Sequence, residues 1–312
     1  MSEHLCRFHF SFTAMASPCE LQLYAASAAE AEHAADAAIA EVQRIEHKYS
    51  RYRDDSVLSQ LNGAAGSGPV DVDPETAALL DYADTAWRES NGLFDISSGV
   101  LREAWDFKSG RLPSTAAVSD CLARLGWQKL RWSSPSLQLP VGMQLDFGGF
   151  GKEYAADRAA ECCLQRGIAH GLVDLGGDIR LIGPHPDGSP WHIGIRDPRN
   201  PERALAVLPL SQGALASSGD YERYMVVDGQ RYSHILDPRN GWPVVAPMRS
   251  VSVVAPLCLL AGTGATVAML QGSAAAPHWL QSLGLPHFWI APDGQQGGSL
   301  CAVASAVAGE YA

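Results

Sequence analysis

Two glycine-rich segments in the middle of the sequence place carboxylates where a ligand could bind. Leu145–Gly149 and Val173–Gly177 share the pattern hydrophobic-Asp-x-Gly-Gly, with Asp146 and Asp174 as the acidic residues. Glycine lets the backbone approach a ligand closely, and its N–H groups can face an anion. Two tight turns in which the aspartates cap helices explain the same pattern equally well. The pattern alone therefore leaves both interpretations open.

Lys152 follows the first of these segments, at the predicted start of a helix. The N-terminus of a helix is the positive end of its dipole and does not favour a cation. This mismatch predicts an anionic partner for Lys152. Gly148–Lys152 also resembles the end of a phosphate-binding loop, but Asp146 stands at the first glycine position and Glu153 at the Ser/Thr position. A P-loop is therefore excluded.

Polar residues further along the chain could move protons or bind a ligand. Asp220 lies in Ser217–Tyr221 (SSGDY), and His234 lies in Tyr232–Gly241 (YSHILDPRNG). A histidine titrates near neutral pH and suits proton transfer. Each residue also has a structural alternative, because His234 could be a hydrogen-bonded strand residue and Asp220 a turn residue.

The hydrophobic pattern predicts the elements that would position these residues. Alternating apolar residues indicate strands, and apolar residues at every third or fourth position indicate helices. Asp73 followed by Pro74 is typical of a helix start, and Asn91–Gly92 is typical of a helix end. The predicted strands span Cys19–Tyr24, Gln144–Phe147, Gly171–Asp174 and Ser250–Val254, and the predicted helices span Ala25–Tyr49, Glu75–Glu89 and Lys152–Gln165.

The C-terminal part of the chain is depleted in charge. Val251–Leu270 has no charged residue over 20 positions, which is long enough to cross a bilayer. Pro256, Gly262 and Gly264 interrupt this stretch, and no Lys or Arg follows Arg249 to anchor a span. A buried strand followed by a buried helix that begins near Pro256 explains the pattern better, so we predict no membrane span.

The composition excludes several classes of protein. The 312 residues include 23 Lys and Arg against 34 Asp and Glu, a net charge of −11, whereas a general nucleic-acid binder needs a basic face. A hydrophobic content of 46% with 18% charged residues argues against disorder. Seven cysteines without a CxxC motif fit a reducing compartment, and Met1–Phe12 lacks the apolar core of a signal peptide. We therefore expect a cytoplasmic location.

Six segments, in this order along the chain, resemble the ApbE family of FAD:protein FMN transferases. The most specific of them contains His-Ile-x-Asp-Pro-x-x-Gly at His234–Gly241. The resemblance runs from about Phe10 to Gly272, which is most of the chain. The segments are Met15–Pro18 (MASP), Asp146–Lys152 (DFGGFGK), Val173–Asp178 (VDLGGD), Ser217–Tyr221 (SSGDY), Tyr232–Gly241 (YSHILDPRNG) and Ala261–Thr266 (AGTGAT).

The resemblance implies a reaction and a fold. Members of the family bind FAD and a divalent metal, usually magnesium, and move FMN onto a Thr or Ser hydroxyl of an acceptor flavoprotein with release of AMP. The implied fold is one α+β domain over residues 1–312, related to the T-fold, with the motifs in about 10–272. Its blocks of helices allow two lobes with the flavin site in the groove between them.

The resemblance also implies roles for single residues. His234 matches the motif histidine, expected to transfer a proton or to orient the incoming hydroxyl, and Asp220 of the SSGDY segment is the second candidate catalytic residue. The backbone carbonyl of Gly149 and the side chain of Thr266 match metal ligands. The residues that match FAD contacts are Met15, Tyr52, Leu93, Phe94, Asp95, Asp146, Lys152 and Ile235.

One position departs from the family pattern. The family usually has an Asp four residues before Thr266, and both bind the metal, but here that position is Gly262. Because magnesium usually takes at least one carboxylate, another residue such as Asp220 or Asp178 could replace it. Otherwise Gly149, Thr266, water and the FAD phosphates hold the metal, or metal-dependent chemistry is lost. An FAD-binding or flavin-delivery protein and an FAD pyrophosphohydrolase that yields FMN and AMP are the alternative functions.

Overall fold

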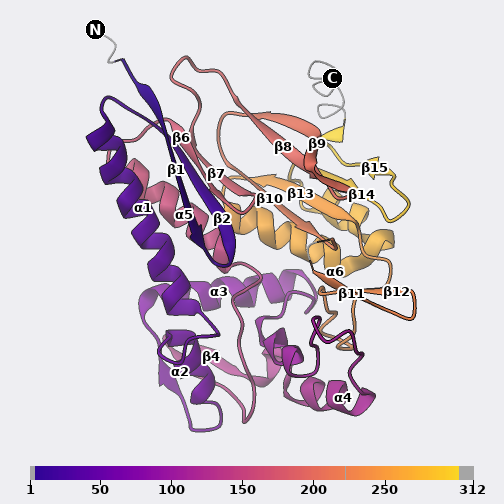
Figure 1. Ribbon diagram of the computed structural model, residues 1–312. Coiled ribbons are helices and arrows are strands. Elements are labelled where there is room, and N and C mark those ends of the chain that lie inside the picture. The colour runs from indigo at the N-terminus through magenta and orange to yellow at the C-terminus, as the bar shows by residue number, and fades with distance from the viewer. Residues whose placement is uncertain (1–3, 222, 302–312) are drawn as a thin grey trace.

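A computed structural model describes residues 4–221 and 223–301 (Figure 1). Its centre is an eight-stranded sheet in which all neighbouring strands are antiparallel. This arrangement, with helices packed on it, confirms the predicted α+β class. In sheet order the strands are β1 (Cys6–Ala14), β2 (Ser17–Ala25), β6 (Gly171–Leu175), β7 (Asp178–Gly183), β10 (Ala214–Gly219), β13 (Ser250–Ala255), β14 (His287–Ile290) and β15 (Gln296–Gly297).

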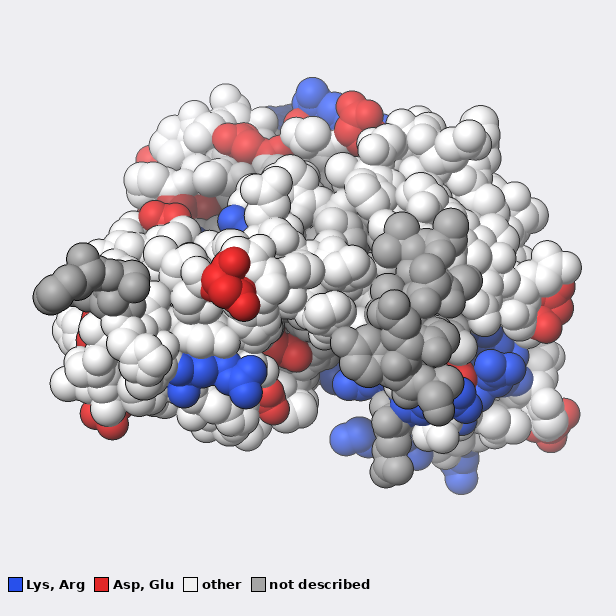
Figure 2. Space-filling view, turned by 90° about the horizontal axis from the view of Figure 1, so that it is seen from above, with Lys and Arg blue, Asp and Glu red and all other residues white. Residues whose placement is uncertain are grey.

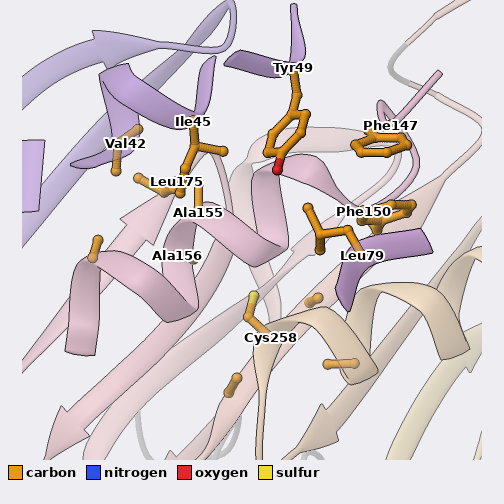
Figure 3. Close-up of a cluster of buried hydrophobic side chains, with 14 of the residues drawn as sticks. Val42, Ile45, Tyr49, Leu79, Phe147, Phe150, Ala155, Ala156, Leu175 and Cys258 are labelled. Atoms are coloured by element: carbon orange, nitrogen blue, oxygen red, sulfur yellow. The ribbon is translucent and has the colours of Figure 1, made fainter. Parts of the chain in front are cut away.

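Three helices cover one face of the sheet: α1 (Ala28–Tyr49), α5 (Gly151–Leu164) and α6 (Cys258–Ser282). Helix α5 contacts both α1 and α6, so the three lie side by side (Figure 1). Most buried residues of α1 and α5 are alanine, which lets these two helices approach closely. Figure 3 shows Ala155 and Ala156 of α5 among larger side chains from α1 and the sheet. The predicted helices at Ala25–Tyr49 and Lys152–Gln165 are confirmed, with shifts of up to three residues at their ends.

The opposite face of the sheet is covered by the two-stranded ribbon of β8 (Trp191–Asp197) and β9 (Asn200–Leu210). In β8 every second residue is buried, as a strand with one face on a core requires. Trp191 and Ile193 pack with Leu172 of β6 and Leu181 of β7 in one apolar cluster. The middle strands of the sheet are therefore buried on both faces, whereas the edge strand β1 keeps exposed residues.

The chain between α1 and α5 forms a separate group of short elements below the sheet in Figure 1. They are α2 (Val57–Gly63), β3 (Val70–Asp71), α3 (Pro74–Glu89), the 3-10 helices η1 (Ile96–Glu103) and η2 (Trp127–Lys129), α4 (Thr115–Arg124), β4 (Arg131–Ser133) and β5 (Ser136–Gln138). A hairpin of β11 (Tyr224–Val227) and β12 (Gln230–Ser233) packs on this group. The segment after β12 is held as well, because the indole N–H of Trp105 donates to the Gly241 carbonyl at 2.8 Å.

The start of α3 confirms the predicted cap and adds an ion network. The Asp73 side chain accepts hydrogen bonds from N–H groups of the first turn of α3. Glu75 accepts hydrogen bonds from Arg44 and Lys48 of α1 and from the Tyr154 hydroxyl of α5. Burial alone would raise the pKa of Glu75, but these three donors lower it to about 2. Glu75 therefore ties three helices together as an ionised carboxylate.

The predicted strand at Gln144–Phe147 is wrong, because the structure has no strand there. The side-chain amide of Asn62 accepts from the Leu145 N–H at 2.7 Å and donates to the Leu145 carbonyl at 3.0 Å. The Asp146 N–H donates to the Ile96 carbonyl. The Asn62 side chain and the Ile96 carbonyl thus satisfy the backbone groups of Leu145 and Asp146, which a neighbouring strand would otherwise bind.

The predicted strand at Ser250–Val254 and the buried helix after it are confirmed as β13 and α6. Within residues 4–221 and 223–301, α6 is the one helix long and apolar enough to cross a membrane, but 61% of its apolar window is buried in the protein, as in the core helix of a soluble fold. It begins at Cys258, where the Asp157 carboxylate accepts from the N–H groups of Cys258 and Leu259 at 2.8 and 2.9 Å. This carboxylate from α5 caps a helix that has no capping side chain of its own.

Candidate active site

Two buried phenylalanines anchor the glycine-rich turn between Asp146 and α5. Phe147 and Phe150 are 2% and 0% exposed, and their ring centroids lie 5.0 Å apart (Figure 3). Gly148 and Gly149, between them, are exposed. The aromatic contacts therefore hold the turn while the backbone of the two glycines stays open to a ligand.

The Asp146 carboxylate lies between two guanidinium groups. It accepts a hydrogen bond from Arg51 Nη1 at 2.8 Å, and Arg102 Nε lies 3.3 Å away. Arg102 also donates to the hydroxyl of Tyr52, a side chain that is 81% exposed. The structure thus brings together two predicted FAD contacts, Asp146 and Tyr52, through arginines that no sequence motif indicated.

Lys152 has the anionic partner that its position predicts. Its ammonium group lies 2.7 Å from Asp178 Oδ2. Asp178 also accepts a hydrogen bond from the Ser217 N–H at 3.2 Å. Gly176 has φ +66°, and a Cβ there would lie 2.8 Å from the Cβ of Ser17, so the turn before β7 must be glycine to fit against β2. The two glycine-rich segments therefore meet beside Lys152.

The other predicted FAD contacts differ in exposure. Met15 lies half-buried in the two-residue turn between β1 and β2, where its N–H donates to Glu46 at 2.6 Å. Ile235 is half-buried too, two residues after the end of β12. Leu93 and Phe94 are 3% and 4% exposed. Those two side chains therefore support the site from beneath, while Met15 and Ile235 retain surface that a ligand can contact.

Asp95 is held by its own neighbours. Its Oδ1 accepts hydrogen bonds from the N–H and hydroxyl of Ser97 at 2.8 and 2.6 Å, and its Oδ2 accepts from the Trp127 N–H at 2.9 Å. The residue is 7% exposed. Its carboxylate caps η1 and ties η2 to it, which is a structural task that the sequence did not reveal.

His234 is arranged as a proton acceptor. Its Nδ1 lies 2.9 Å from the backbone carbonyl of Arg223. Because a carbonyl can only accept, Nδ1 carries the proton, and the Nε2 of the neutral ring keeps its lone pair. Burial lowers the pKa of His234, and the positive charge of nearby Arg102 acts in the same direction. The neutral form is therefore favoured at neutral pH.

Asp220 is buried and ion-paired. It is 3% exposed, and its Oδ2 accepts from Arg249 Nη1 at 2.8 Å, while Arg231 Nη2 lies 3.5 Å from its Oδ1. Burial raises the pKa of Asp220, and the two guanidinium groups oppose this. A hollow of about 490 Å³ is lined in part by Asp220, both arginines and Ser233, the residue before His234.

The predicted metal position Thr266 lies one turn after Gly262, a glycine that a buried carboxyl group faces. Thr266 Oγ1 is 3.2 Å from Ser218 Oγ, and one turn earlier in α6 stands Gly262. Glu153 of α5 faces Gly262, is 8% exposed, and has an Oε2 atom with no hydrogen-bond partner among the described residues. Burial, and then the negative charge of Asp178, raise its pKa to about 8.

Sequence analysis did not identify Glu153 as a site residue. A signal in the sequence could have identified it, because Glu153 lies three residues before the buried Ala156 and therefore on the buried face of an amphipathic helix.

In the part of the chain that the structure describes, no group of three or more His, Cys, Asp or Glu side chains could hold a metal ion. Any metal here must take hydroxyl, carbonyl or ligand oxygens as well.

The profile of the ApbE family matches residues 15–289 of this chain. The chain is 32% identical over 256 residues to the FAD:protein FMN transferase of Salmonella typhimurium, covering 79% of this chain and 73% of that protein. It is also 32% identical over 274 residues to the FAD:protein FMN transferase of Treponema pallidum, covering 81% and 76%.

Solved structures agree with these sequence matches. The crystal structure of the ApbE protein from Thermotoga maritima superimposes with a TM-score of 0.86 at 29% identity, over 94% of this chain and 97% of that one. The flavin transferase ApbE from Vibrio cholerae superimposes with a TM-score of 0.85 at 26% identity, over 95% and 98%. The similarity therefore extends over nearly the whole fold.

Proposed function

The chain belongs to the ApbE family, and from this premise we propose that it transfers FMN from FAD to a Thr or Ser hydroxyl of an acceptor flavoprotein. The acceptor oxygen attacks the phosphorus atom of the FMN half of FAD. A phosphoester bond forms, the diphosphate bond breaks, and AMP leaves with the bridging oxygen. The hydroxyl proton passes to a base, and no electrons are exchanged.

The observation of the site that carries this proposal is the orientation of His234. With Nδ1–H donating to the Arg223 carbonyl, Nε2 is available to accept the proton of the acceptor hydroxyl. The guanidinium groups of Arg51 and Arg102, already oriented by Asp146, can neutralise phosphate oxygens of FAD. Gly148 and Gly149 add exposed backbone at which a ligand can approach.

We further propose that the reaction depends on a divalent metal, with magnesium as the usual ion of the family. The donors fit, because Thr266 offers a hydroxyl oxygen, Gly149 offers a backbone carbonyl and a buried carboxylate oxygen of Glu153 lacks a partner. When bound, such an ion supplies positive charge to the diphosphate. Free thiols at all seven cysteines support a cytoplasmic location as part of the same proposal.

An assay of the purified protein with FAD, Mg²⁺ and a candidate acceptor flavoprotein tests the function. We expect a fluorescent flavin that stays on the acceptor in a denaturing gel and an equal amount of AMP. AMP formed without acceptor would instead identify a pyrophosphohydrolase. Bound FAD with no AMP under any condition would identify a flavin-binding or flavin-delivery protein. Either result would overturn the transferase assignment.

His234→Ala should lower the rate of FMN transfer by about 10²- to 10⁴-fold, the usual contribution of general acid–base catalysis. The affinity for FAD, measured by flavin fluorescence, should change little. His33→Ala is the control, because His33 is exposed on α1. If FAD affinity and transfer fall together, His234 is a binding residue and not the base.

A further inference from the structure

Gly262 leaves a space in α6 that a side chain of the neighbouring helix fills. A Cβ atom on Gly262 would lie 2.5 Å from both Cγ and Oε1 of Glu153 and 2.8 Å from its Cδ, closer than real Cβ atoms come to any neighbour. The Glu153 side chain therefore occupies the volume that any larger residue at position 262 would need. Positions 153 and 262 therefore have room for one carboxylate side chain, and in this chain Glu153 of α5 provides it.

This carboxylate is costly to keep where it is. A charge buried without a partner is strongly unfavourable, so a Glu153 carboxyl with a pKa of about 8 is mostly protonated at neutral pH when no ligand is bound, and even then a buried polar atom without a hydrogen bond is uncommon in proteins. Glu153 is nevertheless 8% exposed, and its Oε2 has no partner among the described residues. The charged neighbours do not remove this cost, because Lys152 forms its 2.7 Å ion pair with Asp178 and Asp157 caps α6. The arrangement is explained if Oε2 has a ligand.

We propose that Glu153 is the carboxylate ligand of a divalent-cation site between α5 and α6, in place of a ligand at Gly262. The Thr266 hydroxyl, one turn after Gly262 on the same helix, is the second side-chain donor. The site uses a single carboxylate and neutral oxygens, which suits magnesium because this ion usually completes its shell with water and substrate phosphates. The inference rests on the proposed function, since the FAD diphosphate is the anion that the cation would neutralise.

The alternative carboxylates are already engaged. Asp220 pairs with Arg249 at 2.8 Å and lies 3.5 Å from Arg231. Asp178 pairs with Lys152 and accepts the Ser217 N–H. Asp220 Oδ1 also lacks a hydrogen bond, but two guanidinium groups face that carboxylate, and a metal would have to displace them. Among the described residues, no hydrogen-bond donor holds Glu153 Oε2. Glu153 is therefore the better candidate to compensate for Gly262.

Metal binding by the purified full chain tests this assignment directly. Mn²⁺ binding is followed by electron paramagnetic resonance, with Mg²⁺ as competitor, with and without saturating FAD. We expect Glu153→Gln, which keeps the shape and removes the charge, to weaken Mn²⁺ binding by roughly tenfold or more, since even second-shell changes cost about that much. Mg²⁺ should raise the melting temperature of the unmodified protein but not that of Glu153→Gln. The matched control is Glu161→Gln, an exposed glutamate on the same helix, which should bind as the unmodified protein does.

A double substitution makes the test specific. Glu153→Ala alone should lose Mn²⁺ binding, and Glu153→Ala combined with Gly262→Asp should regain it, because removing Glu153 makes room for a side chain at position 262. Gly262→Asp alone should be destabilising, since its Cβ meets Glu153. Unchanged Mn²⁺ affinity in Glu153→Gln, or no recovery in a folded double variant, would overturn the assignment.

The outcome separates this assignment from the transferase function. If Mn²⁺ binding depends on Glu153 but the protein transfers no FMN, the metal site is supported and the transferase function is refuted. If the unmodified protein transfers FMN but its Glu153→Gln variant binds Mn²⁺ as tightly as the unmodified protein does, the function is supported and the metal site at Glu153 is refuted.

Discussion

Replacing Asp95 by Ala should destabilise the fold by about 3 kcal/mol. The substitution removes three hydrogen bonds to a buried carboxylate, two from Ser97 and one from the Trp127 N–H, and each is worth about 1 kcal/mol net. Asp95→Asn keeps one acceptor oxygen but turns an NH₂ group toward the remaining donors, so it should lose about half as much. Urea unfolding, with the midpoint and slope fitted together, measures both changes.

The chain contains a matched control for this prediction. Asp187 accepts from the N–H and hydroxyl of Ser189 at 2.9 and 2.6 Å, which is the same Asp-x-Ser turn, but Asp187 is exposed. Asp187→Ala should therefore change stability only slightly. If Asp95→Ala costs no more than Asp187→Ala, the assigned structural task is refuted. If FAD affinity falls while stability is unchanged, Asp95 acts mainly as the FAD contact that the family resemblance implies.

Three further predictions concern the elements around the site. Glu75 has a pKa of about 2 in the fold against its ordinary 4.5, so its stabilising contribution is present above pH 4.5 and is lost as the pH falls toward 2. Glu75→Gln should flatten the stability profile over that range in urea unfolding at several pH values. Asn62→Ala leaves both backbone groups of Leu145 unpaired and should cost about 2 to 3 kcal/mol by the same assay. Asp157→Ala removes both hydrogen bonds that cap the N-terminus of α6. This should cost about 1 to 2 kcal/mol of stability, seen as a lower urea midpoint.

The sequence predicted those parts of the fold that depend on near neighbours. The cap at Asp73 and the helix that follows it require only residues within one turn, and both are found as predicted. The strand at Gln144–Phe147 was predicted from apolar residues alone. It is not formed because Asn62, 83 residues away from Leu145, binds the backbone that a strand partner would need. A contact of that separation leaves no periodic signal.

The site could be predicted only in part for the same reason. The anionic partner of Lys152 was expected from the helix dipole, and Asp178 provides it. The relation between Glu153 and Gly262 could not be expected, because it depends on how α5 packs on α6. The motif identified the absent carboxylate at position 262, but the carboxylate that fills the space belongs to a segment more than 100 residues earlier.

An acidic protein that is proposed to bind an anionic dinucleotide must provide positive charge locally. Asp146 and Asp220 each face two guanidinium groups, so four cations oppose two carboxylates. The carboxylates orient these guanidinium groups before a phosphate arrives, which reduces the entropy lost on binding. The side of the site formed by α5 and α6 has two carboxyl groups, Glu153 and Asp178, against one ammonium group, Lys152, and burial together with Asp178 raises the pKa of Glu153. Arginine can therefore serve phosphate on one side, whereas Lys152 on the other side is paired with Asp178, which supports the divalent cation that we propose for that side.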